Sequence, residues 1–155
     1  MITKILLDFG IDAGYLIAGK VKDFSNSAEL GNDKLFVIES DEYDTAFFDK
    51  RSKFIHYKPS TLLINNLEFD HADIFNNLDD IQKQFHHLIR SLPQNVKVLF
   101  PFGDDNIQTL LKNGFYSIKE PFNFEFSEKG WSMICLLYTS DAADDMQCVD
   151  LGGRR

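Results

Sequence analysis

Residues 78–100, LDDIQKQFHHLIRSLPQNVKVLF, hold the clearest helix-then-strand pattern in the chain. The apolar residues of the first part recur at the spacing of one helix face: Leu78, Ile81, Phe85, Leu88, Ile89 and Leu92. This spacing predicts an amphipathic helix over 78–92, and Pro93 ends it because proline has no N–H for the helical hydrogen bonds. The apolar run at residues 96–100 then predicts a strand.

Similar elements are predicted on both sides of this stretch. Upstream, three apolar runs bounded by Gly, Asp and Asn have the character of buried strands, at residues 15–18, 35–38 and 61–64. Downstream, we expect a short helix over 106–112 that ends at Gly114, and a partly exposed strand over 122–126. Strands that alternate with helices predict an α/β domain whose largely parallel sheet is flanked by helices.

The first nine residues also have helical spacing, and Gly10 follows where a helix would end. No Ser, Thr, Asp or Asn precedes them as a helix cap. We therefore expect the chain to begin inside an element.

Composition narrows the function classes. The chain has 155 residues, 44% of them hydrophobic, which is enough for the core of one domain. Its net charge is -8 with both signs interspersed, so the basic patch of a nucleic-acid binder is missing from the sequence. The sequence has neither an apolar run of about 20 residues nor a signal peptide, which predicts a cytoplasmic protein without a membrane partner. Cys135 and Cys148 do not make a disulfide framework.

Four carboxylates follow the predicted strand 35–38 in ESDEYD, residues 39–44. In a parallel α/β sheet, ligands bind beyond the carboxyl ends of the strands. Clusters of oxygen ligands suit Mg²⁺, which takes one or two carboxylates and keeps several waters. From spacing alone, however, a solvated acidic loop explains these residues better than a metal site does.

A second polar loop, NNLEFDHAD at residues 65–73, follows the predicted strand 61–64. Its histidine, His71, suits three roles: a metal ligand, a proton-transfer group or a neighbour of a helix cap. Each of the two loops alone is weak evidence for a site.

Three strings resemble the central domain of the Mur ligase family, and within it the murein peptide ligases. They are FVIESDEYDTAFFDKRSKF at 36–54, TLLINNLEFDHADIF at 61–75 and IQKQFHHLIR at 81–90. The likeness is good over residues 1–90 and loose over 91–134. It implies a fragment of an ATP- and Mg²⁺-dependent ligase that joins UDP-N-acetylmuramate to L-alanyl-γ-D-glutamyl-meso-diaminopimelate, the murein tripeptide, through an acyl phosphate in peptidoglycan recycling.

The resemblance also implies site residues. Glu39 matches the metal-binding glutamate after the family's strand, and His71 matches a histidine that is both a metal ligand and catalytic. Asn66 is implied as a cofactor-binding residue, and it shapes the loop together with Glu68 and Asp70. On adjacent strand ends, a carboxylate and an imidazole can hold Mg²⁺ against phosphate oxygens.

The sequence departs from the family in ways that predict inactivity of this chain alone. The phosphate loop that ends in Gly-Lys-Thr does not occur in it, and 155 residues leave no room for the family's two flanking domains. Residues 1–134 are thus expected to form a partial central domain. His86 stands where some sister ligases have a modified lysine, and we expect it to be structural.

The last residues have a separate prediction. CLLYTSDAAD, at 135–144, resembles the translation of a transposase sequencing adaptor, so residues 135–155 are predicted to be a non-native tail. The alternative is an ordinary acidic tail.

Two other functions stay open. One is a fragment of the sister ligase that adds L-alanine to the same nucleotide, although the stretch 43–54 favours the tripeptide enzyme. The other is a metal- or ligand-binding module without ligase activity that uses Glu39 and His71.

Overall fold

The computed structural model describes residues 1–19, 21–69, 71–123 and 131–132. Within these ranges the elements are, in chain order, α1 (Ile2–Asp8), β1 (Ala13–Leu16), β2 (Ala28–Gly31), β3 (Phe36–Ile38), β4 (Asp44–Ala46), β5 (Asp49–Ser52), the 3-10 helix η1 (Lys53–His56), β6 (Thr61–Leu63), α2 (Leu78–Ser91), β7 (Lys97–Pro101), α3 (Asp105–Lys112), β8 (Ile118–Asn123) and β9 (Trp131–Ser132). None of these helices is long and apolar enough to cross a bilayer.

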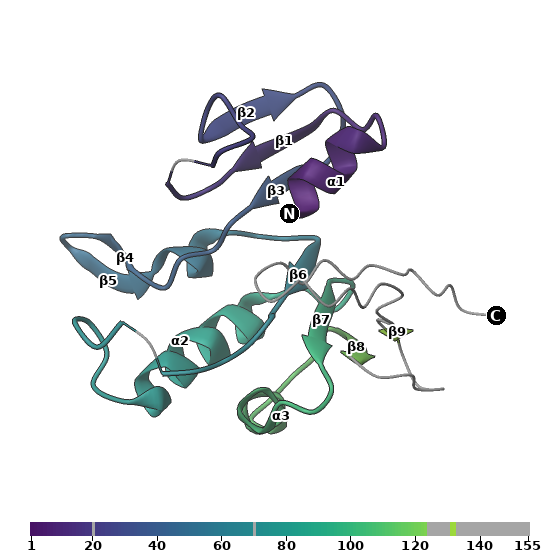
Figure 1. Ribbon diagram of the computed structural model, residues 1–155. Coiled ribbons are helices and arrows are strands. Elements are labelled where there is room, and N and C mark those ends of the chain that lie inside the picture. The colour runs from purple at the N-terminus through teal and green to yellow at the C-terminus, as the bar shows by residue number, and fades with distance from the viewer. Residues whose placement is uncertain (20, 70, 124–130, 133–155) are drawn as a thin grey trace, which may run out of the picture.

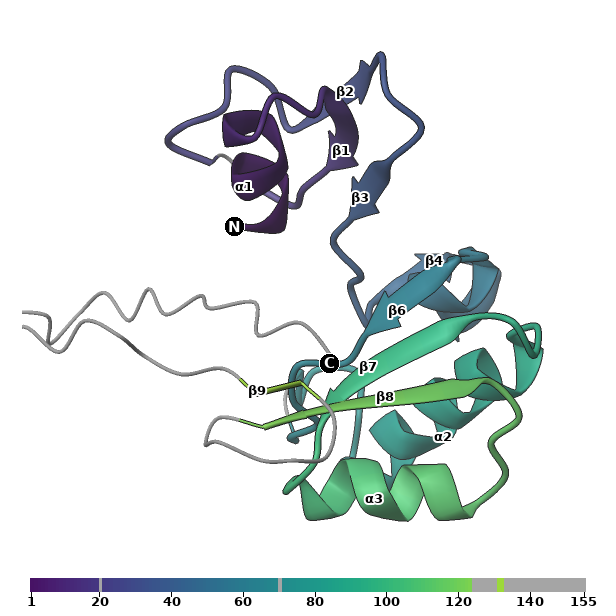
Figure 2. The same ribbon diagram turned by 90° about the vertical axis from the view of Figure 1, so that its right-hand side faces the viewer.

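The described strands form three sheets. The first has the order β2-β1-β3, the second is the hairpin β4-β5, and the third has the order β6-β7-β8-β9. In Figures 1 and 2 the first sheet and α1 form one lobe, and the segment after β3 connects it to the rest of the chain.

The four-stranded sheet is parallel throughout and carries the hydrophobic core. Figure 2 shows α2 and α3 on the same side of this sheet. The apolar face of α2 is buried there through Ile81, Phe85, Leu88 and Ile89. Phe54 of η1 is 2% exposed and packs on Phe85 with 4.9 Å between ring centroids, which joins the hairpin region to α2.

Both long helices begin at a side-chain cap. Asn77 accepts a hydrogen bond from the Asp80 N–H at the start of α2. At α3, Asp104 Oδ1 accepts from the N–H groups of Asn106 at 2.9 Å and Ile107 at 3.0 Å. These bonds satisfy N–H groups that have no partner inside the helix.

The Asp104 cap gives a stability prediction. Asp104→Ala is expected to lower the free energy of unfolding by about 0.5–2 kcal/mol, because two N–H groups of the first turn of α3 lose their acceptor. Urea denaturation of the chain measures the change. Asp104→Asn retains a capping oxygen and should lose less; equal losses in the two variants would contradict the capping role.

The predicted α/β class is confirmed, with a wholly parallel main sheet and helices packed on it. The helices predicted over 1–9, 78–92 and 106–112 correspond to α1, α2 and α3, and the strands predicted over 61–64 and 96–100 correspond to β6 and β7. The strand predicted over 15–18 begins two residues earlier, and the one predicted over 122–126 begins at Ile118. Residues 124–126 lie outside the described ranges.

Two predictions were wrong. The strands do not share one sheet, because β3 pairs with β1 whereas β6 pairs with β7. The run 35–38 is also not buried: Phe36 is 47% exposed and Ile38 39%. The reason is that β3 lies at the edge of the first sheet, in which α1 packs against β1. Apolar runs identify strands and do not specify which strands pair.

Candidate functional site

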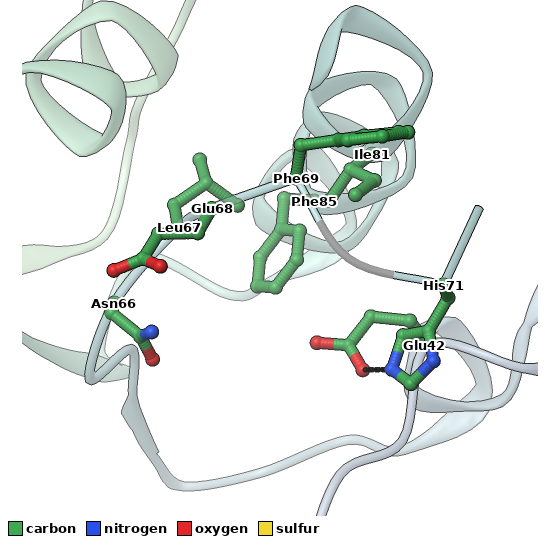
Figure 3. Close-up of a pocket in the computed structure, with 8 residues that line it drawn as sticks. All are labelled: Glu42, Asn66, Leu67, Glu68, Phe69, His71, Ile81 and Phe85. Atoms are coloured by element: carbon green, nitrogen blue, oxygen red, sulfur yellow. Dashed lines mark ion pairs between the residues drawn. The ribbon is translucent and has the colours of Figure 1, made fainter. Parts of the chain in front are cut away.

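The two polar loops nominated by the sequence meet at one pocket. Its lining comes from the segment after β3, the loop after β6 and the face of α2: Glu42, Asn66, Leu67, Glu68, Phe69, His71, Ile81 and Phe85. The cavity has a volume of about 210 Å³. Figure 3 shows Glu42 and His71 on one side of the Phe85 ring and Asn66 and Glu68 on the other.

His71 is held by contacts to both ring nitrogens. Nδ1 lies 3.2 Å from the Tyr43 hydroxyl, and Nε2 lies 3.4 Å from Glu42 Oε2. The His71 backbone is left-handed, with φ 56°, which is uncommon for a residue other than glycine. Its carbonyl accepts from the N–H groups of Ile74 and Phe75, both at 3.0 Å, so a tight turn follows the histidine.

Glu39 has different contacts from those predicted. Its Oε2 accepts from the Ala18 N–H at 2.8 Å, and its own N–H donates to the Leu16 carbonyl. Glu39 therefore connects the ends of β1 and β3 in the first sheet. The expectation that Glu39 and His71 follow adjacent strands was wrong, because their strands belong to separate sheets. Its role as a metal ligand stays a prediction.

Glu42 is the carboxylate that the structure places beside His71. The sequence included it among the four carboxylates of residues 39–44, yet it did not distinguish Glu42 from Glu39. The side chains of an irregular loop do not point in regularly repeating directions. Only the folded backbone therefore reveals which of them turns toward the histidine. Glu42 and His71 are both partly buried, with side chains 29% and 26% exposed.

Asn66 and Glu68 are exposed at the opposite end of the pocket (Figure 3). Leu67 between them is 1% exposed, and its carbonyl accepts from Asn106 Nδ2 at 2.8 Å. The buried leucine and this bond fix the loop to α3, so the two polar neighbours point outward. Asp70 lies outside the described residues.

The donor set fits a magnesium ion only in part, because Mg²⁺ prefers oxygen ligands and an imidazole is a more usual ligand for transition metals. Mg²⁺ in phosphate-binding sites takes one or two carboxylates and completes its shell with water and phosphate oxygens. Glu42 and His71 supply one oxygen and one nitrogen from the same side of the pocket. Among the described residues there is no group of three or more His, Cys, Asp or Glu side chains placed to hold an ion, so the pocket is no closed protein cage.

The pocket is smaller than a typical ligand site. Typical ligand pockets measure roughly 300–1,000 Å³, which exceeds the 210 Å³ here.

The basic residues of the hairpin region are engaged in ion pairs. Arg51 donates two hydrogen bonds of 2.8 Å to the Asp49 carboxylate, and His56 Nε2 lies 3.0 Å from it. The Arg51 guanidinium holds the pKa of the Asp49 carboxyl well below its usual range. Lys53 lies 3.7 Å from Asp41. These ion pairs lie outside the pocket lining.

His86 has a structural contact. Its Nε2 donates to the Asn113 carbonyl at 2.9 Å, which connects α2 to the end of α3. This bond supports the structural role expected of His86.

The sequence of the chain is similar to a known protein family and to individual ligases. Residues 18–140 match the family described as the Mur ligase middle domain. A UDP-N-acetylmuramate–L-alanyl-γ-D-glutamyl-meso-2,6-diaminoheptandioate ligase of Escherichia coli K12 is 52% identical over 120 residues, which cover 77% of this chain and 26% of that protein. A UDP-N-acetylmuramate–L-alanine ligase of Treponema pallidum (strain Nichols) is 25% identical over 132 residues, which cover 84% of this chain and 26% of that protein.

A solved structure is also similar. The crystal structure of the UDP-N-acetylmuramate:L-alanyl-γ-D-glutamyl-meso-diaminopimelate ligase from Neisseria meningitides matches with a TM-score of 0.73 and 43% identity, over 84% of this chain and 42% of that one. The chain spans about a quarter of the length of the E. coli relative. Residues 135–155 lie outside the described part, so the non-native tail stays a prediction. With four-fifths of its residues matched by the family, the chain belongs to the Mur ligase family and contributes to its middle domain.

Proposed function

We propose that the chain is part of an ATP- and Mg²⁺-dependent ligase that joins UDP-N-acetylmuramate to L-alanyl-γ-D-glutamyl-meso-diaminopimelate in peptidoglycan recycling. The observation that carries the proposal is the 52% identity to the E. coli tripeptide ligase. L-alanine ligases are 25% to 34% identical, which favours the tripeptide as the acceptor substrate. The enzyme acts in the cytoplasm on small molecules, without a nucleic-acid or membrane partner.

The residues of this chain serve the phosphoryl transfer from one side of the pocket. Magnesium, when bound, offsets negative charge on the phosphoryl group as it passes from ATP to the UDP-N-acetylmuramate carboxylate. His71 Nε2 and Glu42 Oε2 face each other 3.4 Å apart and would hold the ion from the protein side. Glu39 stays the family-implied carboxylate for the same ion.

The other walls of the pocket serve binding and water exclusion. Asn66, exposed at the opposite end, offers an amide to a polar group of the nucleotide. Ile81 and Phe85 present an apolar surface between the two polar ends, which lowers the local dielectric and strengthens the charge interactions beside it. Attack of the tripeptide amine on the acyl phosphate then forms the amide bond and releases phosphate.

Phosphate release by the full-length protein tests the proposal. With ATP, Mg²⁺ and UDP-N-acetylmuramate present, release is expected to require the tripeptide. Release with L-alanine instead would identify the sister ligase. Metal binding without release in either mixture would indicate a binding module and contradict the proposal.

The 155-residue chain alone is expected to release no phosphate in the same mixture. Its sequence has no Gly-Lys-Thr phosphate loop, so the phosphates of ATP lack their main ring of N–H donors. The assay uses the purified chain beside the full-length protein at equal concentration. Tripeptide-dependent release by the chain alone would show that a phosphate loop is dispensable.

A further inference from the structure

Tyr43 contacts the proposed catalytic histidine in two ways. Its hydroxyl lies 3.2 Å from His71 Nδ1, and the two rings pack with 4.6 Å between centroids at an angle of 60°. The two residues are 28 positions apart in the sequence and belong to loops that follow strands of different sheets. The contact is therefore a product of the tertiary structure and not of local sequence.

The backbone of Tyr43 is fixed on both sides. Its N–H donates to Asp41 Oδ1 at 2.9 Å, and its carbonyl accepts from the Lys53 N–H at 3.0 Å. Lys53 leads directly into Phe54, which is 2% exposed and packs on Phe85 of α2. The tyrosine is thus carried by a segment that is attached to the hydrophobic core.

His71 needs an external group to orient its ring. Its left-handed backbone is a sparsely populated conformation, and its side chain is 26% exposed. An imidazole that acts through one nitrogen is oriented by the group that binds the other nitrogen. A tyrosine hydroxyl both donates and accepts, so it satisfies Nδ1 in either neutral tautomer.

We propose that Tyr43 is a positioning residue for His71: it holds Nδ1 through its hydroxyl and packs against the ring, so that Nε2 is turned toward Glu42 and the pocket. The proposal rests on the proposed function, in which Nε2 is the nitrogen that faces the cation. Tyr43 itself does not touch the reacting atoms.

The contact is tested first by NMR on the 155-residue chain labelled with ¹⁵N. Tyr43→Phe retains the ring and removes only the hydroxyl, so the fold and the melting temperature are expected to be unchanged. The ¹⁵N signal of His71 Nδ1 is expected to shift. Tyr57→Phe is the matched control, because Tyr57 packs against the core from the same segment and lies outside the pocket lining. Unchanged His71 signals in Tyr43→Phe would overturn the proposal.

The positioning role is tested next in the full-length enzyme. Tyr43→Phe is expected to lower the turnover number about 10–100-fold and to raise the Mg²⁺ concentration that gives half-maximal rate, the scale observed when the outer partner of a ligating histidine is lost. Tyr57→Phe should behave like the wild type. A shifted His71 signal with normal turnover would show that the Tyr43–His71 hydrogen bond exists but does not position His71 for catalysis, which would refute the positioning role.

The two proposals fail in different ways. A wild-type full-length enzyme without tripeptide-dependent activity would refute the proposed function and, with it, the positioning role. The NMR experiment on the metal-free chain would then still report whether Tyr43 binds His71.

Discussion

Replacing His71 with alanine in the full-length enzyme is expected to lower the turnover number about 100-fold or more, with a much smaller change in the Michaelis constant for ATP. His71 Nε2 lies 3.4 Å from Glu42 Oε2 at one end of the pocket, where we propose that an ion would meet the transferring phosphoryl group. An interaction that strengthens in the transition state affects turnover, whereas an interaction of equal strength in both states affects the Michaelis constant. Steady-state phosphate release at saturating ATP, Mg²⁺ and both substrates measures the difference.

Three further variants make this test specific. His86→Ala should keep near-normal turnover, because His86 binds the Asn113 carbonyl and lies outside the pocket lining. Glu39→Gln and Glu42→Gln separate the two candidate carboxylates. Replacing the carboxylate that binds the ion should lower turnover, and excess Mg²⁺ should partly restore the rate of that variant. Near-normal turnover of the folded His71 variant, or equal damage from His86→Ala, would refute the assignment.

Replacing Phe54 with alanine is expected to lower the free energy of unfolding by about 3–5 kcal/mol, the usual cost of removing a buried phenylalanine side chain. Phe54 is 2% exposed and packs on Phe85 of α2. Because Lys53 beside it binds the Tyr43 carbonyl, the loss also loosens the segment that carries Glu42 and Tyr43 to the pocket. Thermal and urea denaturation of the chain measure the change.

Phe48→Ala is the matched control for Phe54→Ala. Phe48 belongs to the same segment and is 91% exposed at the tip of the β4-β5 hairpin, so its removal should change stability by less than about 0.5 kcal/mol. Since a typical domain is stable by only about 5–15 kcal/mol, Phe54→Leu provides a milder variant that is expected to stay folded. Similar losses for the alanine variants of Phe48 and Phe54 would contradict the anchoring role.

Elements with a strong period could be predicted from the sequence. The helix face that includes Ile81 and Phe85 lies in the core as expected, and Pro93 follows the end of α2. β2, β4 and β5 were not predicted, because short strands such as Asp49–Ser52 are polar and are defined by antiparallel pairing with a neighbour. The buried position expected for β3 was wrong for a related reason, since burial depends on which element covers a strand.

The candidate site, too, was predicted in part from the sequence and in part determined by the tertiary structure. The sequence by itself determined the α/β class, the family resemblance and the two loops that carry polar chemistry, because these properties reside in local patterns and in long strings of residues. Only the tertiary structure decided that the loops meet through Glu42 and Tyr43, with Glu39 bound to the Ala18 N–H instead. The physical reason is that the direction of a side chain in an irregular loop follows from backbone turns and distant anchors, such as Phe54 on α2, which no local pattern encodes.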